Sequence, residues 1–407
     1  MYTKEHFSKK FGTLSSGNAN IDKIIQESQI NNSTLNLQWI PYENFHYTEL
    51  IADSEYYTLH LARLRNGNDT IDERDYEDCD DVIALKELKN YRYDILEFIK
   101  AIKNIAIDSF YSSCITRFFG ISKNPSTQNY IIVIESYNNT IHSFLSDIFL
   151  DIRWWSKMDL LYQIIESLAI LHENNLIHCD LHSRNISMKN REIYSVIIDP
   201  GLCKLDNDLI LNSNNKNNNV YGSIPYIPPE VLRGNEFTKE GDIYSFGGIM
   251  YEMATGNQPF SDQAHDTYLM IDICNGVRPK ASGTMLNLIP KCYLDKMYQC
   301  WDDDPSKRPT AHELTDIIYL WNSYYINEEF VDADDNRERM NKSHEQKLLR
   351  SLYNFHPQSR YISRHINTLY ELQDSLEDIK SGKCADPNLY TYDMDSKESS
   401  KCIDLKT

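Results

Sequence analysis

The sequence predicts an α+β fold, with a small antiparallel sheet first and a larger, mainly helical part after it. Short extended segments alternate with turns up to Lys86, which is typical of strands in an antiparallel sheet. Residues 93–107 then place apolar side chains at helical spacing, and residues 160–171 repeat one apolar helical face. We therefore expect a single helix beside the small sheet and a mainly helical second part.

Two further elements flank the sheet in chain order. Residues 1–38 mix Lys, Ser, Asn and Gln around one apolar run near Ile21, and they predict a loose N-terminal extension with one short helix. Residues 130–134 are continuously apolar, as in a buried strand. We expect that strand to complete the sheet.

The second half of the chain contains two polar segments. Residues 212–219 are almost all Asn, which predicts a low-complexity insert. Residues 325–407 combine acidic and polar stretches, so we expect a partly disordered tail. Within it, short helices are predicted around 345–352 and 369–379.

One short segment carries most of the chemical information. It reads His-Cys-Asp-Leu-His-Ser-Arg-Asn over residues 178–185, and Asp199-Pro200-Gly201 follows it across a predicted hairpin. Phosphoryl transfer requires one carboxylate to orient a hydroxyl, and an amide and a second carboxylate to hold Mg²⁺ on the phosphates of ATP. Asp180 fits the first role, and Asn185 and Asp199 fit the metal-binding roles.

These residues resemble the motifs of eukaryotic protein kinases, in particular the tyrosine-kinase-like branch that some fungi have expanded. The resemblance covers about residues 39–324. It also rests on Ile-Ala-Leu-Lys at 83–86, on residues 222–230 ending in Pro-Pro-Glu, on Asp-Ile-Tyr-Ser-Phe-Gly at 242–247 and on residues 304–309. It implies a bilobal protein-kinase-like fold that binds ATP and acts on protein hydroxyls.

The resemblance implies roles for further residues that match the family's motifs. Lys86 would hold the α- and β-phosphates and complete a catalytic set with Asp180 and Asn185. Arg308 would pair with Glu230 of the Pro-Pro-Glu motif. The remaining nucleotide-binding positions would be Ile51, Leu59, Ala84 and the hinge residues Glu135 and Tyr137.

The chain departs from the family pattern in the small lobe. Residues 51–59 stand where the family has a glycine-rich loop, yet they contain no glycine, and Glu55 would bring negative charge toward the phosphates. Ala101 falls where the family has the Glu partner of Lys86. Glu97 lies one helical turn earlier and would replace it only if the helix shifted by a turn.

Two departures concern regulation. Cys179 replaces the Arg that holds a phosphorylated activation loop in the family, and Pro200 replaces the Phe whose packing switches activity.

The residues that indicate the acceptor type, Ser/Thr or Tyr, disagree with one another. Gly222-Ser223 resembles the Gly-Thr of Ser/Thr kinases, and His182 stands where many of them carry a Lys, whereas Arg184 directly before Asn185 resembles receptor tyrosine kinases.

We expect an ATP-dependent protein kinase with reduced activity that transfers the γ-phosphate to Ser or Thr, with Tyr as the alternative acceptor. The alternative function is a catalytically impaired pseudokinase that acts as a signalling scaffold. The partners would be protein substrates or signalling proteins. The domain boundaries we expect are an extension over 1–38, a kinase domain over 39–324 and a tail over 325–407.

Composition limits the other classes of function. The formal charge of −19 argues against a nucleic-acid partner. The apolar runs are too short for a membrane span, and nine cysteines without paired spacing or a secretory signal predict free thiols, no zinc site and a cytoplasmic location. The acidic run over 69–81 is expected to be a solvated loop, with a docking site for a basic segment as the alternative.

Overall fold

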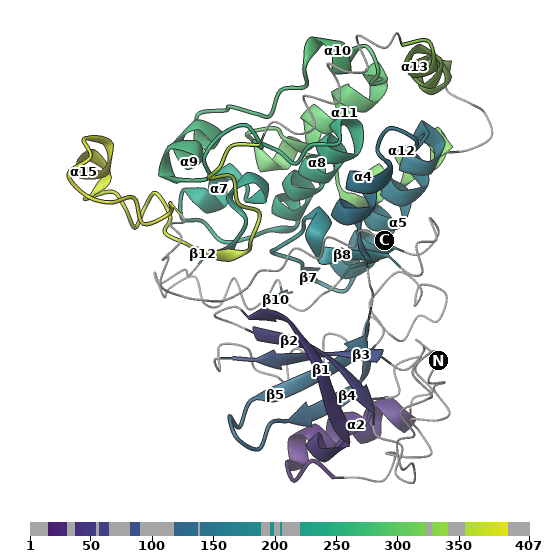
Figure 1. The fold of residues 1–407 in the computed structure, drawn as a ribbon, viewed down its shortest axis with the longest axis vertical. Helices are drawn as coiled ribbons and strands as arrows, with labels where there is room; N and C mark the ends of the chain where they lie inside the picture. The colour runs from purple at the N-terminus through teal and green to yellow at the C-terminus, as the bar shows by residue number, and fades with distance from the viewer. Residues whose placement is uncertain are drawn as a thin grey trace.

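The protein has two lobes, a small sheet-based lobe and a larger helical one (Figure 1). The computed structural model describes residues 15–30, 37–53, 57–64, 82–89, 118–136, 139–188, 196–198, 204–205, 220–322, 328–340 and 355–389. Several expectations fall outside these ranges. They are the helix over 93–107 with Glu97 and Ala101, the loop residue Glu55, the acidic run over 69–81, the Asn-rich insert, the helix around 345–352, and the residues Tyr137, Asp199 and Pro200.

The small lobe is built on a five-stranded antiparallel sheet with the order β1-β2-β3-β5-β4. Its strands are β1 (Phe45–Asp53), β2 (Tyr57–Leu64), β3 (Val82–Leu88), β4 (Phe118–Lys123) and β5 (Tyr130–Glu135). Side chains alternate between the two faces of a strand, so Ile83 and Leu85 on β3 enter one apolar cluster of the lobe. Ala84 points to the opposite face and belongs to the main core.

The N-terminal extension is part of this lobe. Helix α2 (Ala19–Ile30) covers the apolar run expected to be helical, and its buried Ile21 belongs to the same core cluster as Ala84. The chain then runs beside β4, where Ile121 N donates to Gln38 O at 2.8 Å and Ile40 N donates to Ile121 O at 2.9 Å. Residues 37–40 thereby cover the outer edge of the sheet.

The large lobe is mainly helical, as expected. Its helices among the described residues are α4 (Ile141–Ile148), α5 (Trp154–Glu173), α7 (Pro229–Leu232), α8 (Lys239–Thr255), α9 (Thr267–Cys274), α10 (Gly283–Leu286), α11 (Lys291–Cys300), α12 (Ala311–Asn322), α13 (Glu328–Glu338) and α15 (Leu376–Lys380). Helix α5 contains the predicted apolar face over 160–171, and most of its side chains there are buried. Helix α8 is buried from Gly241 to Thr255 and forms the centre of the lobe.

Close packing around α8 requires glycine. A Cβ at Gly247 would lie 2.8 Å from Trp301 Nε1, and a Cβ at Gly248 would lie 2.8 Å from the ring of Tyr226. Both distances are too short for real contacts. The two glycines therefore allow the segment around Tyr226 and the indole of Trp301 to approach the helix directly.

Short strands and 3₁₀ turns shape the surface between the lobes. They comprise β6 (Asn139–Thr140), β7 (Leu176–Ile177), β8 (Ile186–Met188), β9 (Val196–Ile198), β10 (Lys204–Leu205), β11 (Val220–Gly222), η3 (Ser183–Asn185) and η4 (Ile224–Tyr226). The predicted hairpin exists, since β8 pairs antiparallel with β9.

The C-terminal segment 355–389 lies against the large lobe, where Figure 1 shows it running past α7 and α9. Its strand β12 (Arg364–Ile366) pairs antiparallel with β11. Leu369 N donates to Leu232 O at 2.9 Å, and His356 N donates to Ser261 O at 2.8 Å. The helix expected around 369–379 is shorter than predicted. Its first part forms turns, and α15 begins at Leu376.

Candidate active site

The loop that carries Asp180 is clamped to the start of α8. The buried Asp242 carboxylate accepts the backbone N–H of His178 at 2.7 Å and that of Cys179 at 3.0 Å. Its Oδ2 also lies 3.0 Å from His172 Nε2 on α5. Cys179 has a φ of 66°, a left-handed conformation that costs about 1–3 kcal/mol in a residue with a side chain. Asp242 therefore stabilises a strained backbone directly before Asp180.

Asp180 is buried and is oriented by Asn185. The side-chain Nδ2 of Asn185 donates to the backbone oxygen and to Oδ2 of Asp180, both at 2.9 Å. Because Nδ2 makes these bonds, the amide oxygen of Asn185 remains the ligand atom for a hard divalent cation. The donor chemistry at this position fits the metal-binding role predicted for Asn185. Its expected partner Asp199 lies outside the described residues.

His182 has a defined tautomer next to Asp180. Its Nδ1 accepts the backbone N–H of Arg184 at 3.2 Å, so the ring proton is on Nε2. That Nε2 lies 3.6 Å from Asp180 Oδ1. Burial lowers the pKa of His182 to about 3, which keeps the ring neutral at ordinary pH. His182 is therefore a neutral hydrogen-bond donor beside the carboxylate.

A serine from the C-terminal segment completes the arrangement. Ser363 Oγ donates to Asp180 Oδ1 at 2.8 Å and lies 2.9 Å from His182 Nε2. The sequence reasoning missed Ser363. It is 183 residues from Asp180, and no motif surrounds it, so only the fold could have identified it.

Lys86 occupies the strand position that the sequence predicts. Its Cα pairs with Leu59 on β2 and with Ile132 on β5, and its side chain is buried. The ammonium Nζ lies 4.4 Å from the centroid of the Tyr57 ring, a cation–π contact. Ala84, two residues earlier on the same face of β3, is also buried.

The other predicted nucleotide-binding residues lie on the same sheet. Leu59 is partly buried against the core, and Glu135 is half-buried at the end of β5. Ile51 is exposed near the end of β1. The structure thus gathers Leu59, Ala84 and Lys86 on neighbouring strands, whereas Asp180 and Asn185 belong to the other lobe.

The segment before α8 is held by a buried ion pair. Arg308 Nη1 donates to Glu230 Oε1 at 2.6 Å and Nη2 donates to Oε2 at 2.9 Å, which is the bidentate geometry of strong Arg–carboxylate pairs. Gly222, on β11, approaches Asp180 closely. A Cβ there would lie 3.5 Å from Asp180 Oδ1, and its φ of 154° also favours glycine.

Comparison with known protein families decides the identity of this fold. A family model described as the protein kinase domain matches residues 74–320, which is more than half of the chain. This chain belongs to the protein kinase family. Protein kinases use ATP and a divalent metal ion and phosphorylate proteins.

The kinase is similar to serine/threonine and to tyrosine kinases. It is 28% identical over 243 residues to the probable serine/threonine-protein kinase roco5 of Dictyostelium discoideum, with 53% of this chain and 8% of that protein covered. It is 27% identical over 267 residues to a probable serine/threonine-protein kinase of Clostridium acetobutylicum, covering 64% and 39%. It is 29% identical over 190 residues to the human tyrosine-protein kinase FRK, covering 46% and 36%. The alignments therefore span well under half of each relative.

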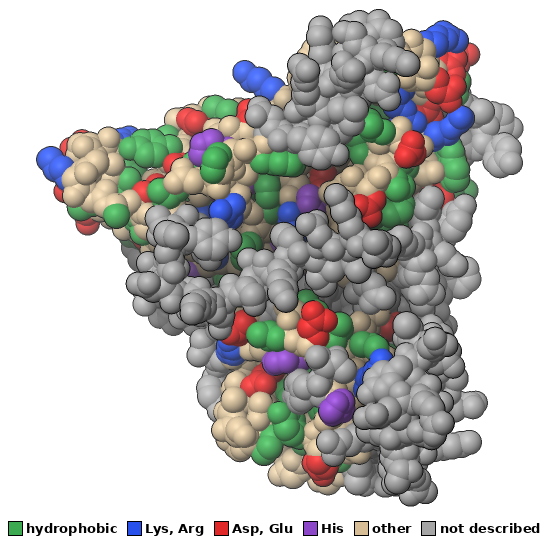
Figure 2. Space-filling view, in the orientation of Figure 1, with side chains coloured by type: hydrophobic (Ala, Val, Ile, Leu, Met, Phe, Trp, Pro, Cys, Tyr) green, Lys and Arg blue, Asp and Glu red, His purple; other side chains and the backbone are tan. Residues whose placement is uncertain are grey.

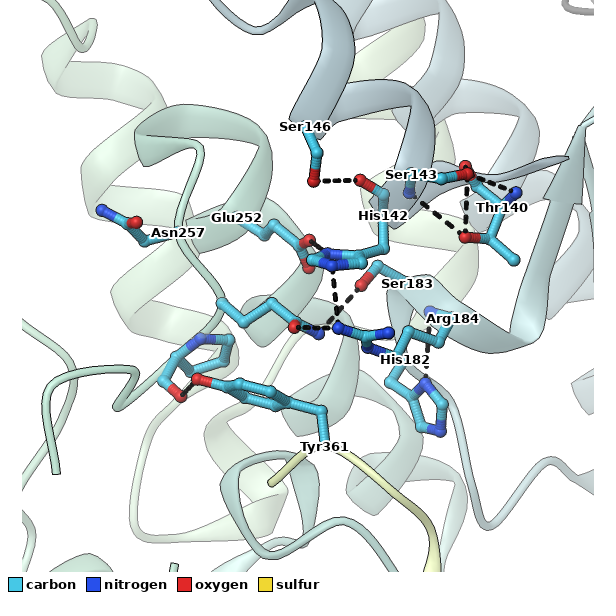
Figure 3. A network of polar contacts seen from close by, with 12 residues as sticks. Thr140, His142, Ser143, Ser146, His182, Ser183, Arg184, Glu252, Asn257 and Tyr361 are labelled. Atoms are coloured by element: carbon cyan, nitrogen blue, oxygen red, sulfur yellow. Dashed lines mark hydrogen bonds and ion pairs between the residues drawn. The ribbon is translucent and has the colours of Figure 1, made fainter. Parts of the chain in front are cut away.

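A polar network anchors the loop over residues 178–185 to the large lobe through Arg184 (Figure 3). Arg184 Nη2 donates to His142 Nε2 at 2.8 Å and to Gln258 Oε1 at 3.2 Å. Because Nε2 of His142 accepts, its Nδ1 carries the proton and donates to the buried Glu252 Oε1 at 2.7 Å. Glu252 also accepts from Tyr226 at 3.0 Å. The guanidinium thus contacts α4 and the loop after α8, and His142 links it to Glu252 on α8.

His142, Glu252 and Gln258 are structural residues that sequence reasoning did not identify, because they occur at no motif spacing. They support η3, which ends at Asn185, and so help to fix the position of the Asn185 amide. Among the helices that the structure describes, none combines the length and the apolar character needed to cross a bilayer.

Proposed function

We propose that this chain is an active cytoplasmic protein kinase that uses Mg²⁺ and ATP and transfers phosphate to serine or threonine in intracellular signalling. When bound, ATP supplies the phosphoryl group and Mg²⁺ offsets the charge of its phosphates. Asn185 and Asp199 would hold the metal ion, and Lys86 would contact the phosphates. The glycine-free stretch from β1 to β2 reduces affinity for the nucleotide, because each Cβ keeps the backbone away from the phosphates.

The single observation that carries the proposal is the contact of a hydroxyl with Asp180. Ser363 Oγ donates to Asp180 Oδ1 at 2.8 Å, which is the geometry that a general base or orienting carboxylate needs toward an acceptor. Positioning supplies most of the catalysis in phosphoryl transfer, and Asp242 and Asn185 position this carboxylate.

The same contact favours serine or threonine over tyrosine. The backbone around Ser363 is set by the pairing of β12 with β11, and from there a hydroxyl one bond beyond Cβ reaches Asp180. A tyrosine hydroxyl lies a whole ring further from its backbone, so the same pairing would carry it past the carboxylate. The Asp180 carboxylate accepts from an aliphatic hydroxyl here, and His182 is a neutral donor to the same hydroxyl.

A phosphotransfer assay tests this function. The full chain is incubated with labelled ATP and Mg²⁺ and with three degenerate peptide libraries, in which the fixed acceptor is Ser, Thr or Tyr. We expect label in the Ser or Thr library or in the kinase itself, and a loss of about 10²–10⁴-fold in Asp180→Asn. Absence of Mg²⁺-dependent label in all three libraries and in the kinase would refute the proposal.

The alternative function is a pseudokinase that serves as a signalling scaffold, and the glycine-free β1–β2 stretch favours it. A thermal-shift titration with ATP separates the two. A kinase binds ATP more strongly with Mg²⁺, so its unfolding temperature rises further when both are present. A scaffold without nucleotide binding shows no shift under either condition.

A further inference from the structure

We propose that residues 361–366 are a built-in substrate, with Ser363 in the acceptor position as a site of phosphorylation in cis. The segment blocks the acceptor groove until Ser363 is modified. This inference rests on the proposed kinase activity and adds to it a modification site and a form of control.

The hydrogen bonds of the Ser363 hydroxyl orient it as a phosphate acceptor. It donates to Asp180 Oδ1 at 2.8 Å, and it accepts from the protonated Nε2 of His182 at 2.9 Å. A hydroxyl has one proton and two lone pairs. With the proton directed to Asp180 and one lone pair to His182, one lone pair remains for attack on phosphorus.

The backbone after Ser363 binds as an added strand. Arg364 pairs with Gly222, and Ile366 pairs with Val220, in an antiparallel register on β11. Adding a strand to an exposed edge is a general way to bind an extended peptide. Gly222 lies opposite the residue that follows the acceptor, and its missing side chain leaves room beside Asp180.

Side chains on both sides of Ser363 anchor the segment. Tyr361 is buried, its hydroxyl donates to Pro259 O at 2.9 Å, and its ring meets His265 edge-on at 4.7 Å. Arg364 Nη2 donates to the backbone oxygens of His265 at 2.9 Å and Asn388 at 2.7 Å. These positions, two before and one after the acceptor, are specificity contacts.

The chain beyond the strand locks this placement. Ile366 is fully buried, and the buried Asn388 Nδ2 donates to Asn367 O at 2.9 Å and to Thr267 Oγ1 at 3.0 Å. Asp386 accepts from the backbone N–H and from the hydroxyl of Thr267. Hydrogen bonds thus attach this part of the chain to the start of α9 as well as to β11, so residues 361–366 are held in a specific position on the large lobe.

Phosphate transfer to Ser363 forms one bond at phosphorus and breaks another. Ser363 Oγ forms a bond to the γ-phosphorus of ATP, and the bond from that phosphorus to its bridging oxygen breaks, so ADP leaves with the electron pair. The hydroxyl proton passes to Asp180 and then to water. The product carries a charge of about −1.5 to −2 next to the Asp180 carboxylate, and this like-charge repulsion expels the segment and opens the groove to other proteins.

Phosphate mapping on the full chain tests the site. The kinase is incubated with ATP and Mg²⁺ over a roughly tenfold range of protein concentration, and modified residues are mapped by mass spectrometry. We expect phosphate on Ser363 with a first-order rate constant independent of concentration. Ser363→Ala removes this phosphate, whereas the matched control Ser381→Ala, which changes an exposed serine of the C-terminal segment 355–389, retains it.

Two variants test the blockade. Arg364→Glu and Ser363→Asp are expected to release the segment, and both are checked for an unchanged fold by circular dichroism. A segment docked in about 99% of molecules raises the apparent KM of a competing peptide about 100-fold, so release should lower this KM by up to that factor.

The outcomes separate this inference from the function on which it rests. Label in the peptide libraries with an unmodified Ser363 overturns the inference and leaves the kinase activity intact. An apparent first-order rate constant that rises in proportion to protein concentration overturns transfer in cis, and an unchanged KM in both variants overturns the blockade. Absence of label in every acceptor, in the parent and in the released variants alike, refutes the kinase activity itself.

Discussion

Replacing Asp242 by Asn should damage both the stability and the catalytic loop of this kinase. The carboxylate accepts the backbone N–H groups of His178 and Cys179 and lies beside His172 Nε2. An Asn has a single acceptor oxygen, so its Nδ2 faces one of these N–H groups and leaves it without a partner. A buried unsatisfied donor costs about 1–3 kcal/mol, and a lost bond to a charged group has a similar effect.

Together these terms predict a loss of about 2–4 kcal/mol in the free energy of unfolding. For a domain of this size, that corresponds to a fall of roughly 4–16 °C in the unfolding temperature. The left-handed Cys179 is then free to relax and move Asp180, and a misplacement of about 1 Å reduces kcat by about 10²-fold.

Scanning calorimetry and a phosphotransfer assay measure the two effects. Asp316→Asn, which removes one carboxylate from an exposed position on α12, is the matched control and should change neither quantity. Adding Cys179→Gly to Asp242→Asn should recover part of the loss, because glycine has no preference to leave the left-handed conformation. If the single variant unfolds within about 1 °C of the parent and keeps kcat within about twofold, the clamp does not have the role assigned to it.

Three further changes have expected outcomes. Arg308→Ala leaves Glu230 buried without its bidentate partner and should cost about 3–5 kcal/mol by urea unfolding, while an unchanged midpoint would show that the pair contributes nothing. Gly222→Ala places a methyl group 3.2 Å from Ile227 and 3.5 Å from Asp180 and should lower kcat/KM about tenfold. A variant with the same kcat/KM as the parent would contradict this expectation. Burial lowers the folded-state pKa of Lys157 to about 7, so between pH 7 and 10.5 the unfolded chain binds more protons and stability rises with pH. Lys157→Met removes this penalty, so its gain in stability should be larger at pH 7 than at pH 9, and a gain equal at both pH values would argue against the shift.

Local patterns predicted the parts of the site that lie close together in the chain. The spacing from Asp180 to Asn185 predicted that both act on one loop, and in the structure the two side chains are joined by a hydrogen bond. The alternation of short extended segments with turns placed Lys86 in a strand, and the structure places it in β3. The pair of Glu230 with Arg308, 78 residues away, was implied by the resemblance to protein kinases and not by a local pattern, and it is present in the structure.

Patterns were less informative where a surface forms between distant segments. On the visible face, hydrophobic, basic and acidic side chains are interspersed among the described residues of both lobes (Figure 2). The tail composition predicted partial disorder for residues 325–407. Yet residues 355–389 carry anchors such as Tyr361 and Ile366 that are buried against the large lobe. Buried side chains so few and so widely spaced produce no periodic signal in the sequence.

The sequence by itself identified the candidate chemical groups of this protein: a carboxylate, an amide and a lysine in the contexts that phosphoryl transfer requires. Periodicity and motif spacing report on residues within a few turns or strands of each other, and these features are of that kind. Only the tertiary structure decided which distant segment lies against Asp180. Ser363 meets Asp180 across 183 residues because β12 adds to β11, and that pairing depends on loop closure and register, which no local pattern encodes.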